Sequence, residues 1–129
     1  MNIKRKIDLI SDLDMGIEQL AMLALTILGE KPAVDIDLYS HNNIDQYKLV
    51  TLLGSMGIPA YATKLPNKKN KNHVSTTCVS NSSDDATLLV SLVEIRNLSS
   101  NGVSDSFHIA YGALMGYPLS AIEGFISGE

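Results

Sequence analysis

The chain has 129 residues, of which 45% are hydrophobic and 19% charged, and this composition excludes wholesale disorder. A formal net charge of −4 at pH 7 argues against non-specific nucleic-acid binding as the main function, because such binding needs clustered lysine and arginine. The single cysteine, Cys78, cannot form an intramolecular disulfide, so we expect a cytoplasmic protein.

Residues 9–28 predict a first helix, with Ser11 and Asp14 spaced as a capping box and apolar residues on almost every side of its second half. Gly29 is expected to end the helix, since a proline follows shortly after it. The longest uncharged apolar run covers only 20–28, whereas a helix that spans a membrane needs about 20 residues. We therefore expect a buried helix and no membrane insertion.

Residues 34–39 alternate between apolar and polar side chains, which predicts a strand with one buried face. Residues 44–56 have helical spacing of apolar residues and stop at Gly57, and 58–65 predict a second strand. A strand, a helix and a strand of these lengths are typical of a βαβ unit, so the two strands are expected to be parallel neighbours.

The polar connector 66–72 predicts a hairpin that leads into a third strand, 73–79, antiparallel to the second. Hydroxyls and carboxylates in 80–85 predict the start of a long helix that runs to about residue 98. Two short helices should follow, with Pro118 at the first position of the last one. The residues of the long helix expected to point inward are Leu88, Leu89, Leu92, Val93 and Ile95.

In the order α-β-α-β-β-α-α-α, these elements predict a single α/β domain over residues 1–129. Its core is expected to be a three-stranded mixed sheet, built from the βαβ unit and the hairpin and packed by about five helices. The sheet is small and the first helix is apolar on too many sides for one interface. We therefore expect the chain to associate with itself as a homodimer.

Two carboxylates stand out on the first predicted strand. Asp35 and Asp37 should project from the same face, a few ångströms apart, which suits a divalent cation such as Mg²⁺ held by oxygen ligands. His41 follows the strand and could complete a composite metal site. The alternative is a pair of acidic side chains that face water from a half-buried strand.

Residues 29–57 resemble the acidic strand of nucleotidyltransferases, including those of toxin–antitoxin systems, in which an Asp-x-Asp strand precedes a helix that ends in glycine. The resemblance covers about a quarter of the chain and implies metal-dependent nucleotidyl transfer by Asp35 and Asp37. In that family a Gly-Gly or Gly-Ser turn precedes the acidic strand, whereas Gly54-Ser55 follows it here.

Four lysines, Lys64, Lys68, Lys69 and Lys71, lie in or beside the polar connector and could bind nucleic-acid phosphates. The alternative is a solvated hairpin tip, which is what most lysine-rich loops are.

The segment Gly112-Ala113-Leu114-Met115-Gly116-Tyr117-Pro118 resembles a helix, Gly-Tyr-Pro turn and helix found in small archaeal and bacterial proteins, and the resemblance implies no activity. Its glycines allow close approach of a helix or a ligand. One interpretation is an interhelical corner in which the glycines serve packing. The other is a groove for a ligand or a partner chain, formed by His108, Tyr111, Gly112, Gly116, Tyr117 and Pro118.

The sequence shows no nucleophile–base pair, zinc-ligand spacing, phosphate loop or dinucleotide fingerprint. Cys78 could pair with a distant histidine as a nucleophile, but its place within a strand favours a small core residue. The sequence therefore favours a non-catalytic binding or interaction module that acts as a homodimer without a cofactor. The alternatives are the metal-dependent enzyme and the nucleic-acid-binding protein, and the sequence does not specify a small-molecule ligand.

Overall fold

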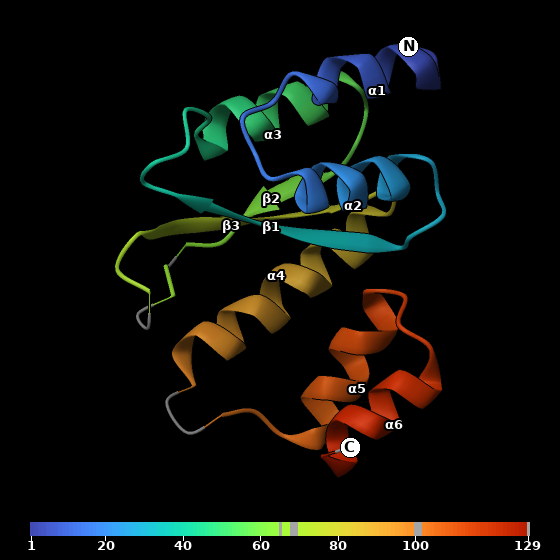
Figure 1. Ribbon diagram of the computed structural model, residues 1–129, viewed down its shortest axis with the longest axis vertical. Helices are drawn as coiled ribbons and strands as arrows, with labels where there is room; N and C mark the ends of the chain where they lie inside the picture. The colour runs from blue at the N-terminus through green and yellow to red at the C-terminus, as the bar shows by residue number, and fades with distance from the viewer. Residues whose placement is uncertain (65, 68–69, 100–101, 129) are drawn as a thin grey trace.

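The computed structural model describes residues 1–64, 66–67, 70–99 and 102–128, and it is a three-layered α/β structure (Figure 1). Helices α1, α2 and α3 lie on one side of the sheet, and α4, α5 and α6 lie on the other. None of the helices in these ranges is both long and apolar enough to cross a membrane. The elements are α1 (Ile3–Ser11), α2 (Ile17–Ile27), β1 (Ala33–Tyr39), α3 (Gln46–Ser55), β2 (Ala60–Ala62), β3 (His73–Ser80), α4 (Ser83–Leu98), α5 (Asp105–Leu114) and α6 (Leu119–Ser127).

The sheet has the strand order β1-β3-β2, and both of its pairings are antiparallel. β1 and β2 run in the same direction, as predicted, but β3 lies between them, so the predicted parallel neighbours and the predicted mixed sheet are both wrong. β3 is buried at every position except Val74, and a strand buried on both faces belongs in the middle of a sheet. β3 pairs with β1 along the whole length of β1, whereas β2 has only three residues and pairs with the other edge of β3.

The N-terminal region forms two helices where the sequence predicted one over 9–28, so the described part of the chain has six helices instead of about five. The capping box is also wrong, because the Ser11 hydroxyl donates to the Asp8 carbonyl at the end of α1. Asp14 lies in the break, where its carboxylate accepts the Asn43 backbone N–H at 2.7 Å. That bond ties the segment between α1 and α2 to the loop after β1, and Gly16 is the N-cap of α2.

Later helices begin and end close to the predicted positions. Asp45 caps α3, Ser82 caps α4, and Gly57 after α3 has φ +76°. Pro118 is the N-cap of α6 and not its first helical residue. On α4 the expected inward residues Leu88 and Ile95 are instead 49% and 51% exposed, because a narrower stripe packs against the sheet, consisting of Ala86, Leu89, Leu92, Val93 and Asn97.

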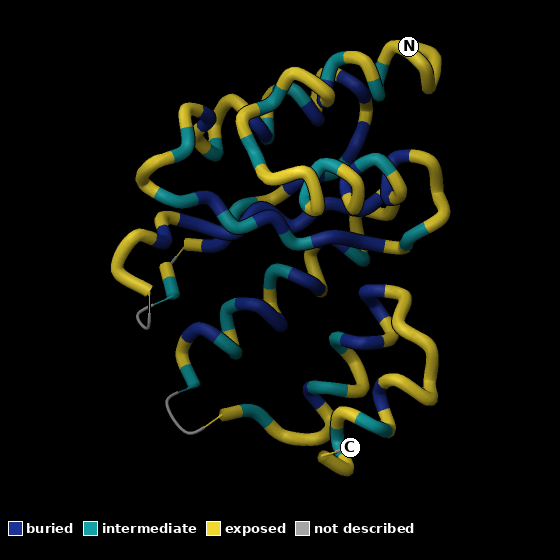
Figure 2. Tube along the Cα trace, in the orientation of Figure 1, coloured by how far each residue is buried: buried dark blue, intermediate teal, exposed yellow. Residues whose placement is uncertain are grey.

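Two apolar clusters fill the spaces above and below the sheet, which is the darkest band in Figure 2. Val34, Ile36 and Leu38 point from β1 into the upper cluster, against α1, α2 and α3. Side chains of β1 alternate between faces, so Asp35 and Asp37 point to the lower face, toward α4 and α5. Asp35 therefore lies between two layers of the fold with its side chain 14% exposed, whereas the side chain of Asp37 is 35% exposed.

Candidate functional site

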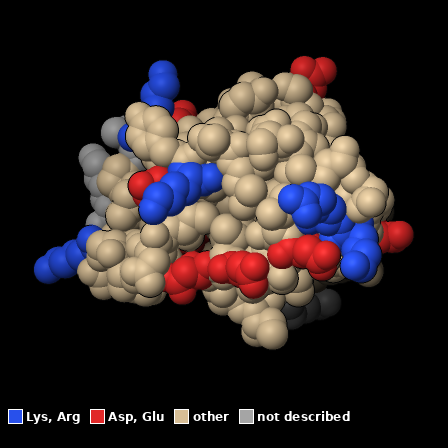
Figure 3. Space-filling view, turned by 90° about the horizontal axis from the view of Figure 1, so that it is seen from above, with Lys and Arg blue, Asp and Glu red and all other residues tan. Residues whose placement is uncertain are grey.

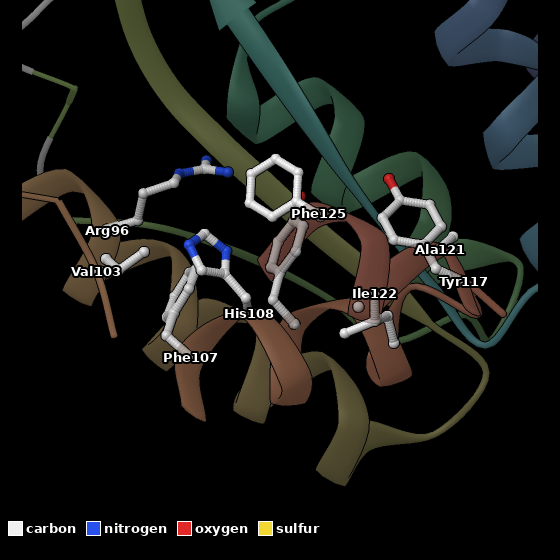
Figure 4. A pocket seen from close by; sticks show the side chains of 10 residues that line it. Arg96, Val103, Phe107, His108, Tyr117, Ala121, Ile122 and Phe125 are labelled. Atoms are coloured by element: carbon white, nitrogen blue, oxygen red, sulfur yellow. The ribbon is translucent and has the colours of Figure 1, made fainter. Parts of the chain in front are cut away.

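A cavity of about 490 Å³ opens between the C-terminal part of α4 and the helices α5 and α6, and we call it the aromatic cavity (Figure 4). Rings and aliphatic side chains make up most of its walls. In Figure 4, Arg96 and His108 lie on one side of it and Tyr117 and Ile122 on the other. The residues that line it are Arg96, Val103, Phe107, His108, Tyr111, Gly112, Tyr117, Ala121, Ile122 and Phe125.

Helical spacing on α5 supplies one wall of the cavity. Phe107 and Tyr111 are one helical turn apart, and their rings stack with centroids 5.7 Å apart and planes 12° from parallel. His108, next to Phe107, meets the ring of Phe125 from α6 edge-on, with centroids 4.7 Å apart. The Phe107–Tyr111 stack lies within α5, and the His108–Phe125 contact joins α5 to α6 beside the cavity.

Two glycines allow close approaches around the corner between α5 and α6. A Cβ atom at Gly112 would lie 2.7 Å from Cγ1 of Ile122, so any larger residue would force the Ile122 side chain or the helices to shift. Gly116 has φ +80°, and a Cβ atom there would lie 2.8 Å from Cδ of Pro32 in the loop before β1. Gly116 and Pro118 therefore form the corner between the helices but do not line the aromatic cavity.

Asp35 joins the sheet to the cavity wall. Its Oδ2 atom accepts a 2.6 Å hydrogen bond from the Tyr111 hydroxyl and lies 3.6 Å from Nη1 of Arg96. The Arg96 guanidinium is also 5.7 Å from the centroid of the Tyr111 ring. Burial, reinforced by the charge of Asp35, raises the pKa of Tyr111, so its hydroxyl stays protonated and keeps donating.

A second, smaller hollow of about 210 Å³ lies at the outer edge of β1, with Asp35 and Lys31 in its wall. Lys31 donates from Nζ to the Met115 carbonyl and lies 5.5 Å from the centroid of the Tyr117 ring. Burial lowers the pKa of Lys31, and the negative charge of Asp35 partly offsets this effect. Tyr117 lines both hollows, so it separates the aromatic cavity from the edge of the sheet.

Comparison of the chain with protein-family models, with curated proteins and with solved structures returns no match. The function must therefore be inferred from the geometry of the chain's own side chains.

Four of the six groove residues named from the sequence, His108, Tyr111, Gly112 and Tyr117, line the aromatic cavity. Sequence reasoning missed the other six lining residues. The four-residue spacing of Phe107 and Tyr111, with Phe125 in the next helix, was an available signal for part of this wall. Arg96 gave no such signal, since it comes from a different helix and its direction depends on how α4 crosses the sheet.

Asp37 is part of a network that ties β1 to β3 and to the connector before it. Its Oδ1 atom accepts from the Thr76 hydroxyl at 2.7 Å and lies 3.1 Å from Nε2 of His73. Nδ1 of His73 accepts the backbone N–H of Asn67 at 2.9 Å, so Nε2 is the nitrogen that carries the proton and donates. The Asp37 carboxylate therefore accepts from side chains of β3, and one of these, His73, is buried at 7% exposure.

The composite metal site suggested by the sequence is not assembled. Asp35 is engaged by Arg96 and Tyr111, and Asp37 by His73, while the ring of His41 stacks on Tyr39 with centroids 5.6 Å apart. Throughout the described ranges, no three histidine, cysteine, aspartate or glutamate side chains lie close enough to hold one ion.

Two of the four lysines proposed for nucleic-acid binding lie within the described residues. Lys64 and Lys71 are exposed, whereas Lys68 and Lys69 lie outside the described residues. The backbone N–H of Lys64 donates to the Glu94 carboxylate at 3.0 Å, which places a negative charge beside it. On the face drawn in Figure 3, basic and acidic side chains are interspersed.

Cys78 lies on β3 and is fully buried in the lower cluster. Burial raises the pKa of its thiol, and the charge of Asp35 raises it further. The thiol is therefore protonated at neutral pH and out of reach of a substrate, which is the opposite of what a nucleophilic cysteine needs.

Proposed function

We propose that the chain is a non-catalytic binding module of the cytoplasm, whose ligand occupies the aromatic cavity. The observation that carries this proposal is the cavity itself, which has the size of small-molecule sites, about 300–1,000 Å³, and mostly apolar walls with a few polar groups. The location rests on the cysteine count, because a chain with a single cysteine makes no intramolecular disulfide and so has no need of an oxidising compartment.

The engagement of the polar side chains around the cavity supports binding over catalysis. Tyr111 donates a hydrogen bond to Asp35, and Lys31, which lines the neighbouring smaller hollow, donates one to the Met115 carbonyl. The hydroxyl of Tyr111 has a raised pKa and is poorly suited to give up its proton as a general acid. These groups fix the shape of the walls and leave the rings to contact a ligand.

Fluorescence of phenylnaphthylamine, an uncharged probe that brightens in apolar surroundings, tests the proposal. Ala121 is exposed on α6 and lines the cavity, so Ala121→Phe should fill it and weaken probe binding by about ten-fold, or ~1.4 kcal/mol. Ala110→Phe is the matched control, because Ala110 is exposed on α5 away from the cavity. Phenylalanine keeps the chain free of tryptophan, which would disturb the signal. Equal binding by both variants, or none by the wild type, would contradict the proposal.

We also propose that the module is a homodimer that uses the outer side of α2. Ile17, Leu25 and Leu28 follow one another along that side with exposed fractions of 84%, 40% and 45%, and Met22 flanks them at 43%. Ala21, also exposed, lies in the middle of the stripe, where a small residue lets a second helix approach. A contiguous exposed apolar stripe of this kind favours a partner, and a second copy supplies the same stripe.

Light scattering at micromolar concentration tests the dimer, for which we expect twice the chain mass of 13.9 kDa. Leu25→Glu should give a monomer, because it places a charge in the stripe. Leu88→Glu is the control, since Leu88 is 49% exposed on α4, on the opposite side of the sheet from α2. A monomeric wild type, or dissociation by both variants, would refute the α2 interface.

A further inference from the structure

Arg96 is the one charged side chain among the described residues that line the aromatic cavity, and its hydrogen-bonding capacity is largely unused. Its side chain is 34% exposed, and its guanidinium lies 3.6 Å from Asp35, beyond the usual length of a hydrogen bond. A guanidinium carries five N–H donors. Within the described part of the chain, those donors have this ion pair and the Tyr111 ring as neighbours, and none of them makes a hydrogen bond.

The single negative charge of Asp35 does not neutralise both cations beside it, Arg96 and Lys31. Its Oδ2 atom already accepts the Tyr111 hydroxyl, and its charge also acts on Lys31 from the other side. Two cations, Arg96 and Lys31, therefore share one carboxylate. Two other acidic groups, Asp37 and Glu94, have partners of their own, His73 and the Lys64 backbone N–H. The cavity floor next to Arg96 consequently favours a negative charge, and its apolar walls strengthen that attraction.

The remaining walls favour a flat ring system. Phe107, Tyr111 and His108 present rings from α5, and Phe125 presents one from α6. In Figure 4 the Arg96 guanidinium reaches from its own side toward the rings at the centre of the view. A ligand whose rings lie among these side chains would place a substituent next to the guanidinium, where a planar carboxylate can accept two parallel N–H bonds.

We infer that the ligand of the aromatic cavity is a small aromatic acid, whose rings pack against Phe107, Tyr111 and Phe125 and whose anionic group binds the guanidinium of Arg96. This inference depends on the proposed binding function and adds the chemical class of the ligand. Arg96 then selects for charge, and the rings select for shape.

Two probes that differ by one charged group test this selection. Anilinonaphthalene sulfonate has the ring system of phenylnaphthylamine with an added sulfonate, so the ratio of their affinities reports the contribution of the charge. Arg96→Gln should weaken the sulfonate probe by about ten-fold or more, the effect of losing hydrogen bonds to a charged group, and leave the uncharged probe within about two-fold. Asp35→Asn should act in the opposite direction and strengthen only the sulfonate probe, because it removes a competing negative charge.

The outcomes separate this inference from the function on which it depends. If the uncharged probe binds and Ala121→Phe weakens it, but Arg96→Gln weakens both probes equally, the cavity binds ligands and the assignment of the anion to Arg96 is wrong. If neither probe binds, the binding function itself fails. If Arg96→Gln does not fold, the wild type decides the matter. The affinity ratio should then fall as salt is raised from low to physiological strength, and a constant ratio overturns the inference.

Discussion

Removing the Tyr111 hydroxyl tests whether the sheet holds the wall of the aromatic cavity. Tyr111→Phe keeps the ring, its stacking on Phe107 and its contact with Arg96, and deletes only the 2.6 Å hydrogen bond to Asp35. A hydrogen bond to a charged group contributes about 1.5–3 kcal/mol. The Asp35 side chain is 14% exposed and keeps its ion pair, so water can replace little of the lost bond. We expect the free energy of unfolding to fall by about 2 kcal/mol.

Urea unfolding of four proteins measures this coupling: the wild type, Tyr111→Phe, Asp35→Asn and the double variant. In the Asp35→Asn background the hydroxyl meets a neutral amide, so its removal should cost only about 1 kcal/mol, which leaves a coupling energy of about 1 kcal/mol. Tyr47→Phe is the control, since Tyr47 is 78% exposed, and it should change stability by less than about 0.5 kcal/mol. A cost below that limit for Tyr111→Phe, or the same cost in both backgrounds, would refute the reasoning.

Three further changes test the packing around the site. Burial raises the pKa of Cys78 in the folded chain, so above about pH 8.5 the unfolded thiol loses its proton while the folded one keeps it. The free energy of unfolding is therefore unaffected by the ionisation of Cys78 below that pH and falls above it. Between pH 7 and pH 10, in reducing urea titrations, the wild type should lose about 2 kcal/mol more than Cys78→Ala, and equal losses would contradict this. Gly116→Ala should cost more than Gly29→Ala, by roughly 1 kcal/mol or more in the same titrations. Both glycines have positive φ, but only at Gly116 would the new Cβ meet Pro32, so equal costs would exclude that contact. Ser82→Ala removes the cap of α4 and should lower the thermal midpoint through a loss of about 1 kcal/mol, and an unchanged midpoint would show that the cap is dispensable.

Local patterns predicted most of the elements but not how the strands are arranged. The alternation in β1, a hydroxyl cap within 80–85 and the glycine after α3 depend on neighbouring residues, and the structure has each of them, with Ser82 as the cap. The position of β3 depends on pairing between strands distant in sequence. The βαβ pattern favoured the commoner arrangement of parallel neighbours, whereas in the structure β3 is buried on both faces and lies between β1 and β2.

The candidate site could be predicted only along a single helix and its corner. His108, Tyr111 and Gly112 lie on α5, so their proximity follows from helical geometry. Arg96 and Asp35 come from α4 and β1, and nothing in the spacing of the sequence places one against the other. The sequence left two roles open for the glycines, helix packing or a ligand groove. Gly112 has both, because Ile122 packs directly against it and it also lines the cavity.

The direction in which Asp35 points connects the fold to the proposed ligand. Alternation along β1 gave two acidic residues on one face, and the natural expectation for such a face is water. In the structure that face is covered by α4 and α5, so the carboxylate of Asp35 needs partners from those helices: Tyr111 donates a hydrogen bond to it and Arg96 forms an ion pair with it. The same covering leaves Arg96 at the cavity wall with most of its donors unused. The carboxylate that suggested a metal site in the sequence therefore acts here as the counter-ion that orients a cation, and that cation is the group best placed to recognise a ligand of opposite charge.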